Sequence, residues 1–499
     1  MLPKMANYLV ILIIVLISLF SLVSSSPKYN HPYSKSPYNR RTKNHHTHSN
    51  FPTPKATRIS TNYTPTWPSL DARPLPKWYD SAKIGIFLHW GVFSVPSFGS
   101  EWFWFYLNNQ DKSYTSFMSA NYPPRYTYQD FGRDFTAEFW DPDKWADLFQ
   151  KAGAKYVVLT SKHHEGFTLW PSKYSFSWNA MDVGPRRDLV GDLANAVRNK
   201  TDIKFGLYHS WLEFFNPMYL KDKANGFKTN TFVKNKAFPE FKELVEAYKP
   251  ELIWSDGDWE SPPEYWKAQE FLAWLYNTSP VKDTVVVNDR WGKGTSCTHG
   301  GFFSCQDHYN PGHLVPYKWE NAMTIDSGSW GYRRNAPLSD YRSSQELITE
   351  LVSTVSCGGN FLINVGPTRE GTISPIFEER LLSIGTWLGI NGVAIYDSVP
   401  WERAQNDSIA KGVWYTTKPE VGKLFAILLE DHWPSGTDQI VLGSVHPSLL
   451  NISSVEILGL EPGKKLKWVP DGDMIIVTLP VVPPGTVNKW GWTMVINHV

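Results

Sequence analysis

Short apolar runs alternate with amphipathic segments from about residue 70 to residue 397. The apolar runs are IGIFLHWG (84–91), YVVLTSKHH (156–164), FGLYHS (205–210), LIWSD (252–256), TVVVNDR (284–290), FFSCQD (302–307), MTID (323–326) and NFLINVG (360–366). The intervening segments, such as DPDKWADLFQKAGA and QELITELVSTV, place apolar residues at helical spacing. This alternation is typical of a parallel sheet covered by helices, and about eight such units predict a (β/α)8-like TIM barrel of the α/β class. An open doubly wound sheet is the alternative, but the sequence lacks the glycine-rich phosphate loop usual in that fold.

The pattern changes after residue 400 to strand-like runs separated by turns, as in GVWYTTK, KLFAILLE and KLKWVPDGDMIIVTLP. The Pro-Asp-Gly sequence at 470–472 is a turn signal between two such runs. A chain of 499 residues exceeds the size, about 250–300 residues, at which a single hydrophobic core stops growing. We therefore predict a catalytic barrel at 67–397 followed by an all-β sandwich at 398–499.

The N-terminal sequence MLPKMANYLVILIIVLISLFSLVSSS predicts a signal peptide over residues 1–26. Its apolar stretch is shorter than the about 20 residues that a membrane span requires. Residues 27–66 are rich in Pro, Ser, Asn, Lys and His and are predicted to form a low-complexity leader. Export into the secretory pathway, to the lysosome or the extracellular space, fits five N-x-S/T sequons, at Asn62, Asn199, Asn277, Asn406 and Asn451. No membrane attachment is expected after removal of the signal.

The balance of charge argues against polyanionic partners. The chain carries 49 Lys and Arg against 48 Asp and Glu, so no global field attracts nucleic acid or an anionic membrane. It also contains 24 Trp, and flat aromatic side chains suit the stacking of sugar rings as well as ordinary core packing.

Nearly every apolar run ends in polar residues. In a barrel the carboxyl ends of the strands face the active site, so these residues are the candidates for function. They are His89 and Trp90, His163 and His164, Tyr208 and His209, Asp256, and Asn288, Asp289 and Arg290. So many polar groups at one rim favour an enzyme over a structural protein.

The stretch LIWSDGDWE holds three acidic residues, Asp256, Asp258 and Glu260. Only Asp256 ends the strand itself, which fixes its carboxylate near the barrel axis. Asp258 and Glu260 are predicted to lie at the rim or to cap a helix that begins near Pro262.

Carboxylates are the reactive groups that the sequence offers. No pattern marks an activated Ser or Cys nucleophile. The adjacent His163 and His164 are expected to point to opposite faces, and no metal motif accompanies them, so hydrogen bonding to a polyhydroxylated ligand is the better interpretation. Two carboxylates can hydrolyse a glycoside with retention or with inversion, depending on their separation. No metal or organic cofactor is implied.

Three cysteines exclude a scaffold built on disulfides. Cys297 and Cys305 bracket the loop CTHGGFFSC, and an oxidising compartment would let them pair. Cys357 is left over and is expected to be buried.

The strand-end motifs taken together resemble the retaining α-L-fucosidases of the eukaryotic lysosomal type, the tissue α-L-fucosidase family. They are GIFLHWGVFSVPSFGSEWF, SKHHEGF, GLYHSW, LIWSDGDWE, VVVNDRWG, YKWENAMTID and GGNFLINVGP. The resemblance runs from about residue 67 to the C-terminus, and it implies a (β/α)8-like barrel with a C-terminal β-sandwich. It places the nucleophile on Asp256 and the fucose-binding residues on His89, Glu101, His163, His164, Tyr208, Trp254 and Arg290.

The resemblance leaves two candidates for the acid/base, Asp307 in SCQDH and Glu320 in YKWENA. Asp307 is preferred because a Cys297–Cys305 bridge would brace its loop. The chain departs from the family pattern at Ala322, where Cys is common, so no role for that thiol carries over.

The implied activity is release of L-fucose from non-reducing α-L-fucosides of glycoproteins and glycolipids by double displacement. The implied partners are fucosylated glycans, and a homo-oligomer is left open. The alternatives are a fucose-binding lectin or inactive homologue and, more weakly, a metal-dependent barrel hydrolase.

Overall fold

The computed structural model describes residues 62–429, 439–482 and 486–498 of the chain. The predicted signal peptide and the predicted leader up to residue 61 lie outside the described residues. All of these described residues belong to one compact unit. In the described part of the chain, no helix has the length and apolar character needed to cross a bilayer.

Seven parallel strands form the main sheet of the described residues, in the order β5-β4-β3-β2-β1-β7-β6. They are β1 (Ile84–Leu88), β2 (Tyr156–Lys162), β3 (Lys204–Ser210), β4 (Leu252–Asp256), β5 (Val286–Val287), β6 (Trp319–Thr324) and β7 (Gly359–Val365). Apart from the first residue of β3 every strand position is buried, as expected for parallel strands covered by helices. The predicted barrel-like α/β fold is confirmed.

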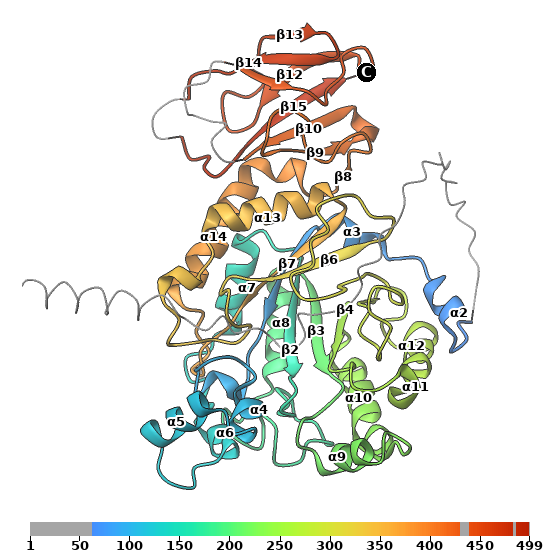
Figure 1. Cartoon of the computed structure of the whole chain (residues 1–499), viewed down its shortest axis with the longest axis vertical. Helices are drawn as coiled ribbons and strands as arrows, with labels where there is room; N and C mark the ends of the chain where they lie inside the picture. Colours follow the sequence, from blue (N-terminus) through green and yellow to red (C-terminus); the bar gives the residue numbers. More distant parts are fainter. Residues whose placement is uncertain (1–61, 430–438, 483–485, 499) are drawn as a thin grey trace, which may run out of the picture. The chain divides into compact units, whose positions relative to one another are not determined.

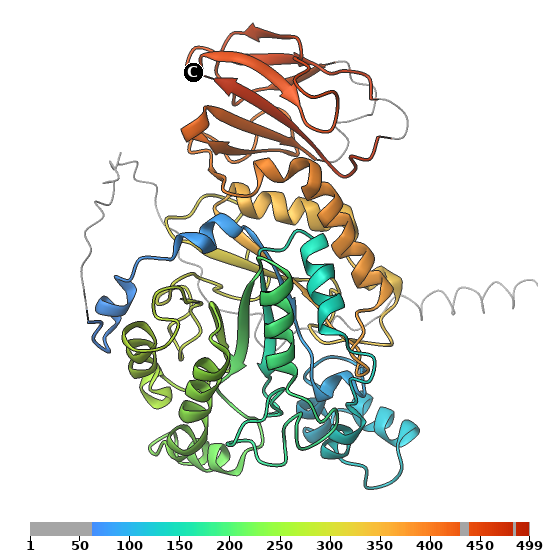
Figure 2. The ribbon, with the colours of Figure 1, turned by 180° about the vertical axis from the view of Figure 1, so that it is seen from behind.

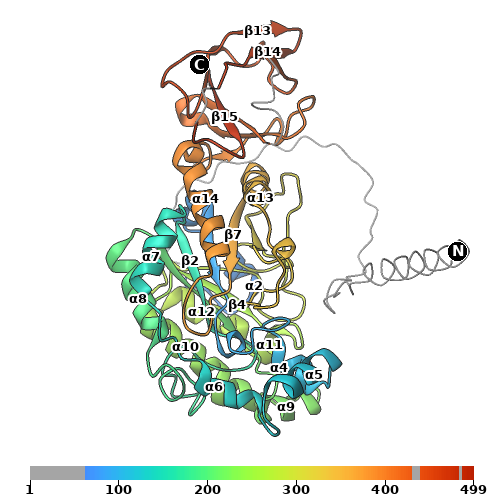
Figure 3. The same ribbon diagram turned by 90° about the vertical axis from the view of Figure 1, so that its left-hand side faces the viewer.

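Helices cover this sheet (Figures 1 and 2). The α-helices of the described residues are α2 (Trp67–Asp71), α3 (Lys77–Ala82), α4 (Phe103–Asn108), α5 (Lys112–Asn121), α6 (Phe131–Asp134), α7 (Pro142–Lys151), α8 (Leu189–Lys200), α9 (Pro217–Ala224), α10 (Phe238–Tyr248), α11 (Pro263–Trp266), α12 (Ala268–Asn277), α13 (Ser344–Ser356) and α14 (Pro375–Asn391). Helices α4, α5, α6 and α9 lie beyond the lower end of the sheet in Figure 1. Along the outer layer α14 packs beside α7, α7 beside α8, and α8 beside α10 (Figure 3).

Side-chain caps explain where two of the helices begin. Helix α7 begins after Asp141, whose side chain accepts hydrogen bonds from the first free backbone N–H groups. Helix α13 begins with a capping box formed by Ser343 and Glu346. The apolar stripes of both helices are buried, so these two predicted helices are confirmed.

The predicted strand at 302–307 is not a regular strand. Phe303 forms a single parallel bridge with Trp319 of β6. Its backbone N–H donates to Lys318 O at 2.9 Å, while the N–H groups of Gly301 and Phe302 donate to Val287 O in β5, both at 3.1 Å. Residues 301–303 therefore close the ring between β5 and β6.

The C-terminal region is all-β. Among residues 398–429, 439–482 and 486–498, antiparallel strands form sheets in the orders β12-β15-β10-β9-β8 and β11-β14-β13. The strands are β8 (Val399–Pro400), β9 (Val413–Lys418), β10 (Lys423–Leu428), β11 (Gln439–Leu442), β12 (Ile452–Ile457), β13 (Trp468–Asp471), β14 (Met474–Thr478) and β15 (Trp492–His498). Buried side chains of both sheets belong to one core, which confirms the predicted sandwich.

Candidate active site

Asp256, the last residue of β4, is the centre of the strand-end cluster. Its Oδ2 accepts a hydrogen bond from the Tyr208 hydroxyl at 2.7 Å, and its Oδ1 accepts one from Arg290 Nη1 at 3.1 Å. Burial and the adjacent Asp256 raise the pKa of Tyr208, so its hydroxyl remains a donor. Asp256 is 7% exposed, which leaves its carboxylate fixed yet reachable.

Arg290 links Asp256 to the second candidate carboxylate, Asp307. Its Nη2 donates to Asp307 Oδ1 at 2.6 Å, while its Nη1 contacts Asp256. Burial acts to lower the pKa of Arg290, but Asp307 and Asp256 outweigh it and raise that pKa. One charged guanidinium therefore contacts both carboxylates. The Asp307 side chain is 44% exposed, whereas that of Asp256 is 10% exposed.

Glu320, the other acid/base candidate, is enclosed within the barrel. Its Oε2 accepts hydrogen bonds from the hydroxyls of Tyr79 and Tyr156, at 2.7 and 2.6 Å, and its Oε1 accepts one from Trp254 Nε1 at 2.9 Å. The residue is fully buried and stands at the amino-terminal end of β6, opposite to the strand ends that carry Asp256. Burial raises the pKa of Glu320 to about 7, although the three donors oppose the shift.

His89 is buried and neutral at physiological pH. Burial, with a contribution from His163, lowers its pKa to about 3. Its Nδ1 lies 2.7 Å from Asn364 Oδ1, and Asn364 Nδ2 donates to Trp330 O, which orients the amide with its oxygen toward the histidine. His89 Nδ1 must therefore carry the proton, and Nε2 is left as an acceptor.

His163 and His164 lie together, so the expectation that they point to opposite faces was wrong. Their ring centroids are 4.0 Å apart. Strand β2 ends at Lys162 and its register shifts just before that residue, so the alternation of a regular strand does not extend to the histidine pair. His163 Nδ1 lies 3.3 Å from Glu165 Oε2.

His164 faces the nucleophile candidate. Its Nε2 lies 3.6 Å from Asp256 Oδ2, and burial, with His163 beside it, lowers its pKa well below the ordinary value. Its Nδ1 lies 2.7 Å from Ser210 Oγ, whose own hydrogen is donated to Leu212 O. His164 Nδ1 must therefore be the donor in that pair, and Nε2 is an acceptor directed toward Asp256.

Glu101 lies in the loop before α4 and is held by a second loop. Its Oε2 accepts hydrogen bonds from Ser329 Oγ and from the backbone N–H groups of Trp330 and Gly331, at 3.0, 3.0 and 3.1 Å. Burial acts to raise its pKa, but the nearby histidines and the backbone donors hold the pKa below its ordinary value. Glu101 therefore brings a negative charge to the histidine cluster.

An aromatic wall borders these polar groups. The Trp254 ring lies 5.3 Å from Phe87 and 5.9 Å from Tyr208, and Phe87 lies 5.8 Å from Trp330. The Arg290 guanidinium stands 4.5 Å from the Trp254 ring centroid, a cation–π contact. The site thus combines an apolar surface with hydrogen-bonding groups, as sugar-binding sites require.

Asp258 is not the rim residue or helix cap that the sequence suggested. It is 5% exposed, and its Oδ2 accepts a hydrogen bond from Gly292 N at 2.7 Å. Burial, reinforced by the charge of Asp256, raises its pKa to about 7. Helix α11 starts without a side-chain cap. Gly257, with φ of 71°, turns the chain between Asp256 and Asp258 so that both carboxyl groups are buried. The Asp-Gly-Asp spacing is the signal in the sequence for this arrangement.

Glu260 is closer to the predicted rim position than Asp258 is, because its side chain is 25% exposed. It accepts hydrogen bonds from the Tyr219 hydroxyl and Lys223 Nζ.

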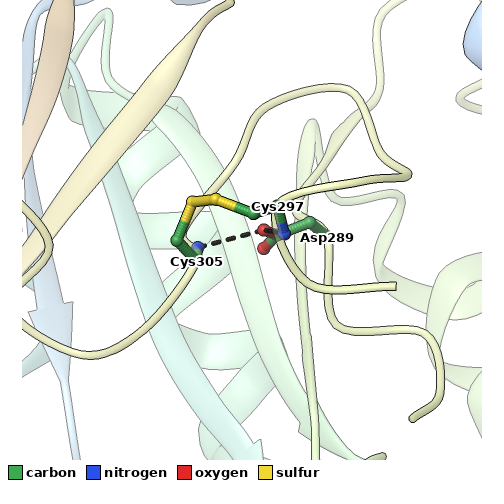
Figure 4. A group of neighbouring side chains, drawn as sticks. All are labelled: Asp289, Cys297 and Cys305. Carbon is green, nitrogen blue, oxygen red and sulfur yellow. Dashed lines mark hydrogen bonds between the residues drawn. A yellow bond between two sulfur atoms is a disulfide. The ribbon is translucent and has the colours of Figure 1, made fainter. Parts of the chain in front are cut away.

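Cys297 and Cys305 form the predicted disulfide, and Cys357 is buried with a free thiol. The carboxyl group of Asp289 lies against the bridge (Figure 4). These three side chains are close enough to be metal ligands, but the sulfurs are bonded to each other and both Asp289 oxygens accept hydrogen bonds from the loop. This group is therefore a loop brace.

Comparison with known proteins assigns the chain to a family. The family model for alpha-L-fucosidase matches residues 51–393, and the model for the alpha-L-fucosidase C-terminal domain matches residues 405–497. The chain belongs to the α-L-fucosidase family. The resemblance seen in the motifs is thereby confirmed.

Similar family members span almost the whole chain. It is 54% identical over 444 residues to the plasma alpha-L-fucosidase of Homo sapiens, covering 88% of this chain and 93% of that protein. It is 54% identical over 440 residues to the human tissue alpha-L-fucosidase, covering 88% and 92%. A solved structure of Thermotoga maritima alpha-fucosidase in complex with fucose superposes with a TM-score of 0.73 at 35% identity, covering 87% of this chain and all of that one.

Proposed function

We propose that this member of the α-L-fucosidase family releases L-fucose from non-reducing α-L-fucosides of glycoproteins and glycolipids, with retention of configuration. The proposal is carried by one observation: the two terminal nitrogens of Arg290 bind one carboxylate each, Nη1 that of Asp256 and Nη2 that of Asp307. Double displacement needs two carboxyl groups that flank the scissile bond. The similarity to fucosidases from plasma and tissue supports the choice of sugar.

In the first step an Asp256 oxygen forms a bond to the anomeric carbon while the bond from that carbon to the leaving oxygen breaks. Asp307 gives its proton to the leaving oxygen. In the second step Asp307 takes a proton from water, the water oxygen attacks the anomeric carbon, and Asp256 is released. Two inversions give net retention.

Arg290 serves both carboxylates in this scheme. Its charge stabilises Asp256 before the attack, when that carboxylate is anionic. After proton transfer Asp307 carries the negative charge, and the same guanidinium is within hydrogen-bond distance of it. Tyr208 holds the other Asp256 oxygen and so directs the free lone pair toward the substrate.

Sugar recognition follows from the acceptors in the cluster. His89 and His164 each direct an acceptor Nε2 away from their Nδ1 partners, and Glu101 adds a carboxylate. Hydroxyl groups of fucose can donate to these three side chains. Trp254 and Phe87 supply apolar surface for the C5 methyl group.

Asp307 is preferred to Glu320 as the acid and base. A leaving glycan must reach the acid, and the Asp307 side chain is 44% exposed whereas Glu320 is fully buried. Glu320 instead accepts the Trp254 indole hydrogen, so we assign it to support of the sugar-binding wall.

We also propose that the predicted signal peptide directs the chain into the secretory pathway, to the lysosome or the extracellular space. Enzymes named for plasma and for tissue among its relatives support this coarse location. Fucosylated glycans are the proposed partners.

A proton NMR time course on an aryl α-L-fucoside tests the proposal. Retention requires α-L-fucose to appear before mutarotation, and β-L-fucose appearing first would refute it. A protein that binds fucose without turnover would instead be the lectin or inactive homologue. Loss of activity in a chelator would favour the metal-dependent hydrolase.

A further inference from the structure

The side chain of Asp289 is buried against the disulfide loop. Its Oδ1 accepts hydrogen bonds from the backbone N–H and the hydroxyl of Ser304, at 3.0 and 2.6 Å. Its Oδ2 accepts from the backbone N–H groups of Cys297 and Cys305, at 2.7 and 3.0 Å (Figure 4). Asp289 is 0% exposed, and both of its oxygens act as acceptors, which suits an ionised carboxylate. All four donors belong to the segment from Cys297 to Cys305.

The backbone of this loop needs an external support. Cys297 and Cys305 have φ angles of 58° and 54°, and His308, just beyond Asp307, has φ of 56°. Residues with a Cβ rarely adopt this left-handed conformation, and it persists where surrounding contacts hold it. Asp289 supplies such contacts because it binds the N–H groups of both cysteines.

The loop also reaches the two carboxylates of the site. Ser304 Oγ donates to Asp289 and accepts a hydrogen bond from Arg290 Nε at 3.3 Å. Arg290 in turn contacts Asp256 and Asp307, and Asp307 follows Cys305 by two residues. Asp289 therefore has two routes to Asp307, through the loop backbone and through Ser304 and Arg290.

We propose that Asp289 is a positioning residue, which acts through the Cys297–Cys305 loop to place Asp307 for proton transfer. Asp256 stands on β4 and does not depend on this loop for its backbone position. Loss of Asp289 is therefore expected to impair proton transfer far more than nucleophilic attack. The inference rests on the proposed function, in which Asp307 is the acid and base.

Impaired proton transfer with intact nucleophilic attack can be recognised in the kinetics of substrates with different leaving groups. A good leaving group departs without a proton, so attack by Asp256 still forms the glycosyl-enzyme. Its hydrolysis then slows, because water attacks only as Asp307 removes its proton. Azide attacks the anomeric carbon without losing a proton, so it bypasses Asp307 and yields a fucosyl azide of retained configuration.

The test is Asp289→Asn in the full-length enzyme, compared on methyl and 2,4-dinitrophenyl α-L-fucoside. The amide nitrogen would face donors where an oxygen now accepts. We expect kcat/KM to fall by about 100-fold or more for the methyl glycoside and by less than about 10-fold for the aryl glycoside. Azide is expected to raise kcat on the aryl glycoside by at least about 5-fold. Equal losses on both substrates with no azide effect would overturn the inference.

Asp407→Asn is the matched control. Asp407 lies in the C-terminal region and is 9% exposed, and it accepts hydrogen bonds from four backbone N–H groups and from the Tyr415 hydroxyl. Its replacement should lower the melting temperature without changing the ratio of the two substrates. The same ratio change in both variants would show a general effect of instability and refute the positioning role.

Two further variants keep the outcomes distinct. If Asp289→Asn does not fold, Ser304→Ala takes its place, because it removes one of the four hydrogen-bond donors to Asp289. We expect its loss in kcat/KM to be at least about 5-fold larger on the methyl glycoside than on the aryl glycoside. An equal loss on both substrates would overturn the inference. Asp307→Ala is measured in parallel. If Asp307→Ala discriminates between leaving groups and Asp289→Asn does not, the positioning role fails alone. If Asp307→Ala does not discriminate, the proposed acid fails.

Discussion

Asp256 and Asp307 contact the same guanidinium, yet the protein supports them by different means. Asp256 ends a fully buried strand, is 7% exposed and is fixed by the hydrogen bonds of a parallel sheet. Asp307 lies in an irregular loop with a side chain that is 44% exposed. That loop is shaped by a disulfide and by the buried Asp289.

The difference matches the demands of the two proposed roles, nucleophile for Asp256 and acid and base for Asp307. A nucleophile must meet one carbon along a fixed direction, and a strand end holds such a group rigidly. An acid that becomes a base must be reached first by a leaving glycan and then by water, so it needs exposure. A braced loop provides exposure at the expense of regular backbone hydrogen bonds.

Removing Asp256, the proposed nucleophile, should produce the largest effect. We expect Asp256→Ala to lower kcat/KM by at least about 10⁴-fold on every fucoside, because the proposed mechanism forms the glycosyl-enzyme on Asp256. Azide should rescue Asp256→Gly and give the inverted β-fucosyl azide, which NMR identifies. Glu260→Ala is the control and should stay within about 3-fold of the wild type. Undiminished turnover by Asp256→Ala would remove Asp256 from its role.

Comparison of Asp307→Ala with Glu320→Gln should sharpen the assignment of the acid. For Asp307→Ala we expect a loss of about 10²–10³-fold on methyl α-L-fucoside and a much smaller loss on the dinitrophenyl glycoside. Glu320→Gln should lower both rates by similar factors, because Glu320 is fully buried and contacts Trp254. The opposite pattern would make Glu320 the acid.

The buried Asp258, which lies next to Asp256 at the end of β4, should make the stability of the protein depend on pH. Its folded pKa of about 7 exceeds that of an unfolded Asp, so its contribution to stability is complete below pH about 4 and is lost as pH rises through about 7. Relative to the wild type, Asp258→Asn should gain at least about 2 kcal/mol in unfolding free energy between pH 4 and pH 8.

Urea denaturation at both pH values measures the gain for Asp258→Asn. A constant difference between Asp258→Asn and the wild type across this range would contradict the raised pKa.

The smallest effect is expected from the Tyr208 hydroxyl, which orients Asp256 without reacting. Tyr208→Phe removes one hydrogen bond and should lower kcat/KM by about 10-fold, equally for good and poor leaving groups. Tyr79→Phe is the matched control, because its hydroxyl donates to Glu320 instead. A loss confined to poor leaving groups would place Tyr208 in proton transfer and not in support of Asp256.

The strand-end pattern of the sequence selected several residues that the structure brings together, because parallel strands carry their final side chains to one edge of the barrel. Asp256, Tyr208 and Arg290 were selected in this way, and they are in contact in the structure. Alternation along a strand stops predicting side-chain direction where the backbone leaves regular geometry. His163 and His164 lie beyond β2, so the period of two no longer applies to them. Asp258 follows a glycine turn that carries it inward.

The choice between Asp307 and Glu320 shows why a motif alone is insufficient. Glu320 is the second residue of β6, so it lies at the amino end of that strand, away from the strand ends that carry Asp256. The sequence alone does not show this, because the predicted strand could begin before or after Glu320. Sequence patterns predict that a strand exists better than they predict its first residue. The enclosure of Glu320 by two tyrosines and an indole arises from segments far apart in the chain.

By itself the sequence determined the fold class, the C-terminal sandwich and the identity of the nucleophile candidate. Each of these depends on local periodicity or on a residue fixed to a strand end. Only the tertiary structure decided which carboxyl groups are exposed, which histidine nitrogens accept, and how Asp289 holds the loop of Asp307. Those properties depend on burial and on hydrogen bonds between distant segments, and neither is encoded in the spacing of neighbouring residues.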